Sequence, residues 1–339
     1  MIKKPTSSDV ARHAGVSQSA VSRVFTPGAS VSPDMAKRVR ASADALGYRP
    51  NALARGLITG RSRIIGLVVA YLDNPFYPDA IEKLSNALQA KGYHLLIFTT
   101  GRHGIDTDSV VQDILDYQVD GLILASITIT ADLTKRCADA RIPLVLFNRG
   151  LPGSGLSAVT SGNETGGRRI AEFLLAGGHE RIAHISGFDG AQTARDRLRG
   201  FTAGLDAAGA ALHAHVPGEF DRATASEAAR TLMDRPDPPD AIFVANDHMA
   251  LAVMDTLRHD LGVDVPGDVS VVGYDDVHMA AWPAYDLTTL RQPSRRMVDA
   301  TVKELLSQID TPAAPRQRIE IDGPLVIRGS ARIPDGWSS

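Results

Sequence analysis

From residue 64 to residue 273, short runs of Val, Ile and Leu alternate with stretches in which apolar residues recur at helical spacing. The runs are almost continuously apolar, which is typical of strands buried on both faces of a sheet. Strands that alternate with helices predict parallel sheets covered by helices, an α/β fold. The candidate strands are residues 64–70, 94–99, 120–125, 142–147, 181–186, 240–245 and 269–273.

The first 25 residues have a different pattern, which predicts two short helices around a tight turn. Ser7 or Ser8 can cap the first helix, Gly15 permits the turn, and Ser17 can cap the second helix. Apolar positions in the second helix, from Ala20 onward, face inward at helical spacing. The polar positions left outside are Gln18, Ser19, Ser22 and Arg23.

A third helix is expected from about Pro33 to Leu46, with Ser32 as N-cap and Gly47 as C-cap. We therefore expect a helix-turn-helix headpiece over residues 1–49, a short helix and linker over 50–62, and an α/β domain over 63–335. The 339 residues suffice for several compact units, each with its own core.

Charge is distributed unevenly along the chain. Residues 1–62 carry ten Lys or Arg against three Asp, a net charge of +7, whereas the whole chain carries −3 and the remainder therefore −10. A compact basic segment attached to an acidic body is typical of a polyanion-binding head, because basic side chains that neutralise phosphates release condensed counterions. A solvated basic face without a partner is the alternative that charge alone leaves open.

The composition fits a folded protein of a reducing compartment. Cys137 is the single cysteine, so no intrachain disulfide is possible. No apolar segment follows Lys3 and Lys4 as in a secretory signal, and no apolar run approaches the length of a membrane span. We expect a cytoplasmic protein.

Several sequence motifs resemble the LacI/GalR (lactose repressor) family of bacterial transcription regulators, over nearly the whole chain. In the headpiece these are DVARHAGVS at 9–17, AVSRV at 20–24 and LGYRPNALARGL at 46–57. Further along they are NPFY at 74–77, GHERIAHI at 178–185, Arg197 with RGF at 199–201, AND at 245–247 and VVGYDD at 271–276.

The resemblance implies a fold of two similar subdomains, like those of periplasmic sugar-binding proteins, with a ligand in the cleft between them. The N-subdomain is expected at about 63–161 and 292–320, and the C-subdomain at about 162–291 and 321–335. Open α/β sheets bind ligands beyond the carboxyl ends of their strands, which agrees with this placement. The implied function is sequence-specific DNA binding, as a repressor controlled by a small polar effector such as a sugar, a sugar acid or a sugar phosphate.

In a helix-turn-helix, the second helix enters the major groove. Gln18 and Ser19 lie where side chains reach base edges, and Arg23 can form a bidentate pair with guanine. Ser17 and Ser22 are suited to phosphate contacts. Ala20 departs from the family, which usually has threonine there, so base preference cannot be transferred from a relative.

The segment from Asn51 to Leu57 is too short to be a stable helix alone. In the family this hinge folds on the operator, pairs with its dimer mate and inserts a leucine into the minor groove, which kinks the duplex. Leu57 matches that leucine, and Ala54 is small enough for close approach. A plain interdomain linker is the alternative.

Three polar residues match family positions that bind the effector: Arg197, Asn246 and Asp275. Asp accepts, Arg donates and Asn does both, which suits a ring of hydroxyls. Each also has a structural alternative, for instance a helix cap for Asn246. The apolar candidates are Phe76 and Phe220, and the further polar candidates are Arg149, Thr193 and Gln292. A cation at Arg149 favours a carboxylate or phosphate on the effector.

Two other functions remain as alternatives, a periplasmic-type sugar-binding protein and a sugar-processing enzyme. The sequence has no Walker A motif, Gly-x-Ser-x-Gly elbow or Rossmann glycine pattern, so we expect no catalytic residue, cofactor or metal. His213 and His215 lack a third metal ligand nearby. Two headpieces that read a pseudo-palindrome require two-fold symmetry, and the short tail after Arg328 favours a homodimer.

Overall fold

The computed structural model describes residues 4–26, 29–49, 61–100, 107–125, 131–151 and 153–337. The chain divides into two compact units, residues 1–63 and 64–339. No helix in the described ranges is long and apolar enough to cross a membrane.

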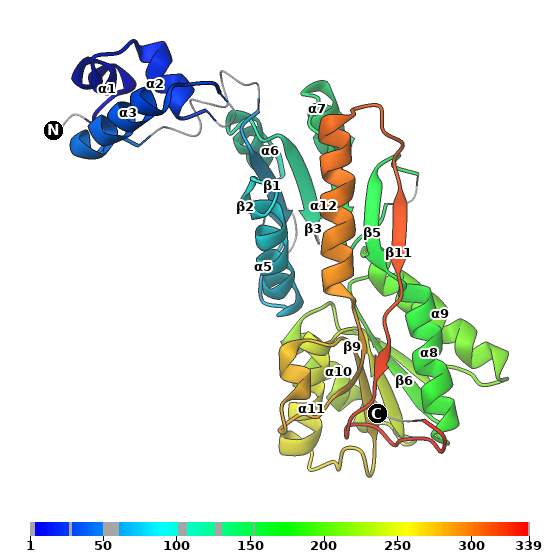
Figure 1. The fold of residues 1–339 in the computed structure, drawn as a ribbon. Helices are drawn as coiled ribbons and strands as arrows, with labels where there is room; N and C mark the ends of the chain where they lie inside the picture. Colours follow the sequence, from blue (N-terminus) through cyan, green and yellow to red (C-terminus); the bar gives the residue numbers. More distant parts are fainter. Residues whose placement is uncertain are drawn as a thin grey trace. The chain divides into compact units, whose positions relative to one another are not determined.

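The described residues of the smaller unit form a headpiece with three helices (Figure 1). They are α1 (Ser7–Ala14), α2 (Gln18–Val24) and α3 (Pro33–Leu46). Ser17 and Ser32 cap α2 and α3, and Gly15 and Gly47 end α1 and α3 with φ of +66°, as their positions predict.

The expected cap of α1 was one residue or two residues too late. Thr6 is the N-cap: its hydroxyl accepts from the Asp9 amide at 3.3 Å, and the Asp9 carboxylate accepts from the Thr6 amide at 2.9 Å. This reciprocal capping box satisfies two amide groups at the start of the helix, whereas a single serine could satisfy only one. The three helices enclose a small core around Val10, Val21 and Val39.

The larger unit has two lobes, each built on a six-stranded sheet (Figure 1). In the first lobe the strand order is β11-β5-β4-β3-β1-β2, and all pairs are parallel. Helices α5, α6, α7 and α12 cover this sheet. The strands are β1 (Ile64–Val69), β2 (His94–Thr99), β3 (Gly121–Ala125), β4 (Leu144–Phe147), β5 (Ser157–Ser161) and β11 (Arg318–Ile321). The helices are α5 (Phe76–Gln89), α6 (Thr107–Asp116), α7 (Ala131–Asp139) and α12 (Ser294–Asp310).

In the second lobe the order is β12-β10-β9-β8-β6-β7, parallel except for β12 against β10. Figure 1 shows α8 and α9 on one side of this sheet and α10 and α11 on the other. The strands are β6 (Ile182–Ser186), β7 (Ala214–Pro217), β8 (Ala241–Val244), β9 (Ser270–Asp275), β10 (Thr288–Arg291) and β12 (Leu325–Val326). The helices are α8 (Asn163–Ala176), α9 (Gln192–Ala207), α10 (Arg222–Met233) and α11 (Asp247–Asp255).

The chain crosses between the lobes three times, from β5 to α8, from β10 to α12 and from β11 to β12. The crossing segments lie against one another without room for side chains at two glycines. A Cβ on Gly162 would lie 1.9 Å from the Asp322 carboxylate, and one on Gly323 would lie 1.8 Å from the Arg291 carbonyl oxygen. The crossings therefore bring polar residues from distant parts of the sequence to the space between the lobes.

Close helix packing fixes the position of α9 on α8. A Cβ on Gly167 of α8 would lie 2.3 Å from the Arg197 carbonyl oxygen, and one on Gly200 of α9 would lie 2.0 Å from the Glu164 carbonyl oxygen. The backbones of the two helices can approach this closely only because neither residue has a side chain. This packing fixes the position of α9, and with it the point from which the Arg197 side chain projects.

Candidate functional site

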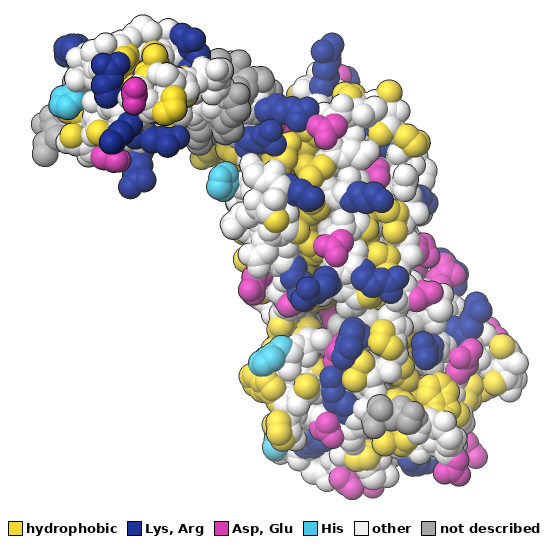
Figure 2. Space-filling view, in the orientation of Figure 1, with side chains coloured by type: hydrophobic (Ala, Val, Ile, Leu, Met, Phe, Trp, Pro, Cys, Tyr) yellow, Lys and Arg dark blue, Asp and Glu magenta, His cyan; other side chains and the backbone are white. Residues whose placement is uncertain are grey.

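The outer face of α2 is the candidate DNA-reading surface. Gln18, Ser19 and Arg23 are exposed, and Ser22 is half-buried. Ala20 points the other way, with 5% of its surface exposed, toward the core of the headpiece. Figure 2 shows Lys and Arg side chains at several places on the headpiece and fewer Asp or Glu.

Hydrogen bonds hold some of these side chains and leave others for a partner. The Gln18 side-chain amide donates to the Ser7 hydroxyl at 2.9 Å, and the Ser17 and Ser19 hydroxyls are 2.9 Å apart. The Ser17 hydroxyl also accepts from the Ala20 amide at 3.2 Å as the cap of α2. Arg23 makes no ion pair with any residue that the structure describes. Its guanidinium can therefore bind a base edge or a phosphate without breaking an existing contact.

The three expected hinge residues, Asn51, Ala54 and Leu57, lie outside the described residues.

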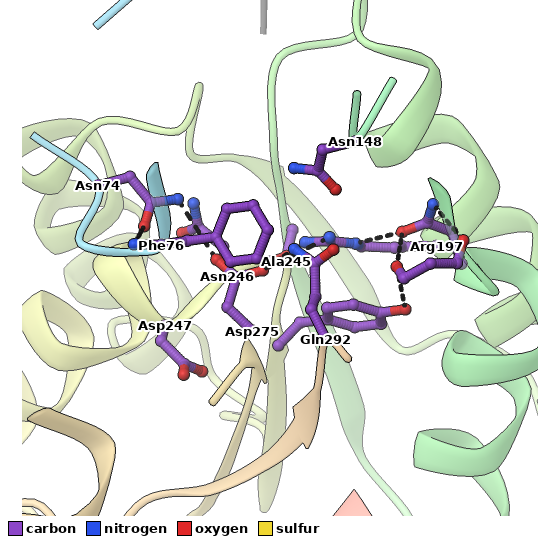
Figure 3. Close-up of polar contacts among 12 residues, drawn as sticks. Asn74, Phe76, Asn148, Arg197, Ala245, Asn246, Asp247, Asp275 and Gln292 are labelled. Atoms are coloured by element: carbon purple, nitrogen blue, oxygen red, sulfur yellow. Dashed lines mark hydrogen bonds and ion pairs between the residues drawn. The ribbon is translucent and has the colours of Figure 1, made fainter. Parts of the chain in front are cut away.

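A pocket lies between the two lobes of the α/β unit, beyond the carboxyl ends of several strands (Figure 3). We call it the effector pocket. The first lobe contributes Tyr71, Asn74, Tyr77, Asn148 and Arg149. The second lobe contributes Thr193, Arg197, Phe220, Asn246 and Asp275.

A buried ion pair forms the floor of the effector pocket. Arg197 Nη2 lies 3.5 Å from Asp275 Oδ1, and both side chains are almost inaccessible to solvent. The guanidinium stacks over the Tyr274 ring, 3.6 Å from its centroid. Its Nε donates to Asn163 Oδ1 at 2.9 Å, and Nη1 donates to the Ala245 carbonyl oxygen. These bonds fix the fork of the guanidinium in one orientation.

Asp275 ends β9 with a φ of +131°, a strained conformation for a residue with a side chain. Its carboxylate is held from both sides: Gln292 Nε2 donates to Oδ1 at 2.7 Å, and Asn74 Nδ2 donates to Oδ2 at 3.3 Å. Burial raises the pKa of Asp275, and Arg197 and the two amides oppose that rise because they stabilise the charged form. The carboxylate is thus an oriented acceptor at the meeting point of the two lobes.

A second carboxylate, Asp247, lies behind Asp275 and is fully buried. It accepts from the Thr289 hydroxyl at 2.6 Å and from the Val277 amide at 2.9 Å, but it has no cationic partner among the described residues. Burial, reinforced by the charge of Asp275, raises the pKa of Asp247 to about 7. Asp247 therefore links the start of α11 to the loop after β9 by a hydrogen bond, and it does not line the pocket.

Asn246 is a helix cap, one of the two roles that the sequence left open, and its position is compatible with the other. Its Oδ1 accepts from the Met249 amide at 2.9 Å and caps α11. The residue also lines the effector pocket. The cap uses the side-chain oxygen and leaves the amide nitrogen as a donor for a ligand.

Six of the eight expected effector residues line the pocket, and Phe76 and Gln292 do not. Phe76 begins α5 and packs in the core, 6.3 Å from the Phe147 ring centroid and 5.4 Å from that of Tyr77. Gln292 is buried where β10 leaves the second lobe, and it orients Asp275. Phe220 lies against Gly187, where a Cβ would come within 2.1 Å of the ring.

Four pocket residues were not expected from the sequence: Tyr71, Asn74, Tyr77 and Asn148. Asn74 and Tyr77 belong to the NPFY motif, of which only Phe76 was expected in the pocket. Asn148 has a φ of +62° and donates to the Tyr77 hydroxyl at 3.3 Å. Asn148 Oδ1 and Gln292 Oε1 are buried acceptors without a hydrogen-bond donor in the described structure. Hydroxyl groups of a bound molecule could satisfy acceptors of this kind.

In the described ranges, no group of three or more His, Cys, Asp or Glu could hold a metal ion. His213 Nε2 lies 2.8 Å from the Asp237 carbonyl oxygen, in the approach to β7.

Comparisons with known proteins match both units. Residues 6–51 match the model of bacterial regulatory proteins of the lacI family, and residues 171–331 match a periplasmic binding protein-like domain. The HTH-type transcriptional repressor PurR of Photobacterium profundum is 32% identical over 330 residues, covering 96% of this chain and 98% of that protein.

Two solved structures extend the likeness to three dimensions. A complex of the transcriptional regulator CelR with cellobiose has a TM-score of 0.74 at 32% identity, over 96% of this chain and 100% of that one. The Lac repressor dimer bound to operator and the anti-inducer ONPF has a TM-score of 0.86 at 27% identity, over 97% and 99% of the two chains. Both the order of the elements and the two-lobed architecture are thus shared with regulators of this type.

Proposed function

The chain belongs to the lacI family of bacterial regulatory proteins, and from this membership we propose that it is a repressor that binds a pseudo-palindromic operator as a homodimer. Binding of a small polar effector lowers or raises its affinity for the operator. The Lac repressor of similar fold is a dimer on its operator, which supports the partner and the symmetry. The observation that carries the effector assignment is the Arg197–Asp275 pair in a polar pocket between two lobes.

The effector is a sugar or sugar derivative. Carboxylate, guanidinium and amide groups in one pocket can satisfy the alternating donors and acceptors of ring hydroxyls. CelR, a relative of known structure, binds cellobiose. Arg149 makes no ion pair with a described residue, whereas Arg197 is neutralised by Asp275, so the pocket favours an effector that carries a carboxylate or phosphate.

Signal transfer follows from the position of the pocket. An effector that contacts both lobes stabilises one arrangement of the lobes over another, and this differential affinity is the coupling free energy between effector and DNA. We propose residues 50–57 as the hinge that receives the change, and subdomain limits at about 63–161 with 292–320 and 162–291 with 321–335. The protein acts in the cytoplasm, where its DNA lies, and has no catalytic role.

The test selects an operator and then an effector. The full chain is first used to select binding sequences from random duplexes, and selection of a sequence with two-fold symmetry is expected. A thermal-shift screen of sugars, sugar acids and sugar phosphates then identifies the effector. Each hit should change the affinity for the selected operator; hits that stabilise the protein but leave operator affinity unchanged would contradict regulation through this pocket.

The hinge is tested separately by Leu57→Ala. If Leu57 enters the minor groove, the variant loses specific operator binding, because no side chain remains to unstack the central base step. Fluorescence anisotropy with operator and with scrambled duplex measures the loss, and calorimetry with the effector should give the wild-type affinity. Unchanged operator affinity would remove Leu57 from the interface.

A further inference from the structure

The effector pocket is nearly filled by its own side chains. Its free space is about 10 Å³, which is room for about one water molecule. The side chains that line it bond to one another: Arg197 pairs with Asp275 at 3.5 Å, and Asn148 donates to the Tyr77 hydroxyl at 3.3 Å. A sugar ring is much larger than a water molecule, so the two lobes have to part before an effector can reach the floor of the pocket.

The second lobe holds its side of the pocket rigidly. The Arg197 guanidinium donates to Asn163 and to the Ala245 carbonyl oxygen, and it stacks on the Tyr274 ring. All three partners belong to the second lobe. Breaking these contacts would leave a buried charge without its hydrogen bonds, which costs much free energy. The movement that admits an effector is therefore a movement of the first lobe away from Arg197 and Asp275.

Asn74 connects the first lobe to Asp275. Its Nδ2 donates to Asp275 Oδ2 at 3.3 Å, and the residue is 4% exposed (Figure 3). Its Oδ1 accepts from the Phe76 amide at 3.0 Å, which fixes the side chain to the start of α5. Phe76 in turn packs on Phe147 in the core of the first lobe. A rotation of the Asn74 side chain alone would break its bond to Phe76, so Asn74 leaves Asp275 only when the first lobe moves.

Asp275 is also bonded to one of the three crossings between the lobes. The Gln292 side chain donates to Asp275 Oδ1 at 2.7 Å, and the Gln292 amide donates to the Asp275 carbonyl oxygen at 3.1 Å. Next to it, the Arg291 amide donates to the Pro324 carbonyl oxygen of another crossing at 2.9 Å. One aspartate thus contacts Asn74 across the pocket and Gln292 at a crossing, so the arrangement of the lobes and the geometry of the crossings depend on the same residue.

We propose that the hydrogen bond between Asn74 and Asp275 is a latch that holds the two lobes together, and that an effector releases it by replacing Asn74 on the Asp275 carboxylate; this rests on the proposed function. The replacing group is a hydrogen-bond donor of the effector, because the carboxylate accepts at both oxygens. The latch sets the fraction of chains whose pocket is accessible, and with it the apparent affinity for the effector.

Asn74→Asp removes the latch with little change of shape. The substitution keeps an oxygen that can accept from the Phe76 amide, and it replaces the donating amide by a carboxylate that repels Asp275. A second variant, Asn74→Ser, also keeps an acceptor for Phe76 and is too short to reach Asp275. The control is Asn86→Asp, which makes the same change of charge at an exposed asparagine of α5.

An exchange variant tests the pair itself. Asn74→Asp combined with Asp275→Asn again places a donor opposite an acceptor, with the direction of the hydrogen bond reversed. If the two residues act as a pair, the exchange restores the latch that the single substitution removes. A general disturbance of the pocket would not be reversed by a second substitution.

Lobe separation is measured by double electron–electron resonance between spin labels, with no sugar present. The labels are placed at Glu82→Cys on α5 and Glu227→Cys on α10, both exposed, in a Cys137→Ser chain diluted with unlabelled chain. In Asn74→Asp the ratio of parted to closed lobes should rise about tenfold to a hundredfold, the effect of one hydrogen bond to a charged group. The distances in Asn86→Asp and in the exchange variant should match those of the wild type.

The selected operator then connects the latch to DNA binding. Without any sugar, Asn74→Asp should change the operator affinity by about fivefold or more, because it parts the lobes as an effector does. Asn86→Asp should bind the operator with the wild-type affinity. Fluorescence anisotropy measures both affinities on the full chain.

The outcomes separate the latch from the function on which it rests. Wild-type distances in both Asn74→Asp and Asn74→Ser, or an exchange variant whose lobes stay parted, overturn the latch and leave the proposed function intact. Parted lobes with an unchanged operator affinity support the latch and contradict the proposed signal transfer from the lobes to DNA.

Discussion

The outer face of α2 and the floor of the effector pocket both consist of polar side chains, but these side chains differ in their burial and in how many neighbours hold them. On α2, Gln18, Ser19 and Arg23 are exposed, and Arg23 has no ion-pair partner in the described headpiece. In the pocket, Arg197 and Asp275 are buried and each is held by several neighbours. Binding and stability are therefore separable on the first surface and coupled on the second.

The difference follows from whether the side chains that contact the ligand are hydrated or buried before the ligand binds. DNA approaches a helix face from solvent, so the reading side chains can stay hydrated until it arrives. A small effector is enclosed, so its partners must be buried before it binds, and a buried charge is tolerated only when it is paired and hydrogen-bonded. The effector pocket is consequently part of the structure that holds the lobes in place.

The largest effect that this comparison predicts is that of Asp275→Ala. Removal of the carboxylate leaves Arg197 as a buried unpaired charge, and breaking a buried pair in this way costs about 3–5 kcal/mol of unfolding free energy. Urea denaturation measures the loss, and calorimetry should find no effector binding. Asp299→Ala, an exposed aspartate of α12, is the control and should stay within about 0.5 kcal/mol of wild type. If the variant lost effector binding but kept wild-type stability, binding and stability would be as separable in the pocket as they are on α2.

Asp247 should make the stability of the α/β unit depend on pH. Its pKa is about 7 in the folded chain and 3.8 in an unperturbed aspartate, so the folded state binds the proton more tightly. The contribution of Asp247 to stability is then greatest at low pH, and it falls by about 1.4 kcal/mol per pH unit at most as pH rises from about 4 to about 7. Urea denaturation at pH 5 and pH 7 should show a smaller fall for Asp247→Asn than for wild type. Equal slopes in the two proteins would mean that Asp247 titrates normally.

Arg23→Ala tests the separable surface. Loss of a bidentate base contact should weaken operator binding by about 1–3 kcal/mol and relax the sequence preference at one position. Thermal unfolding of the headpiece should not change, because the side chain is exposed and unpaired. The control is Arg40→Ala on α3, also exposed, which should weaken operator and random duplex alike. If Arg23→Ala behaves as the control does, the residue contacts phosphate only.

The smallest effect is expected from Arg149→Gln, at the open edge of the pocket. Arg149 is half-buried, so its substitution should leave stability unchanged. The wild-type protein should prefer an acidic sugar to its neutral counterpart, and the variant should lose that preference by about tenfold, or about 1.4 kcal/mol. Competition calorimetry with glucuronate and glucose measures it. A wild-type protein that prefers the neutral sugar would refute the anionic effector.

The sequence was sufficient for features that depend on neighbours in the chain. Six of the seven candidate strands contain a strand of the structure, and the seventh, 269–273, overlaps β9, which continues to Asp275. The caps Ser17, Ser32 and Gly47 are where their positions predict. The five strands that were missed have two to five residues each, β12 being the shortest. Segments so short have too few residues to show a periodicity, and their pairing with distant strands makes them strands.

In the effector pocket, too, some features followed from the sequence and others only from the tertiary structure. The sequence determined the identity of Arg197, Asn246 and Asp275 through family motifs, and it determined the two units through charge and periodicity. Only the tertiary structure decided that Asn74 reaches Asp275 across 201 residues, that Phe76 packs in the core and that Gln292 orients a carboxylate. A cap or a turn depends on residues within about four positions, whereas the direction of a pocket side chain depends on three chain crossings and on glycines that let two helices touch.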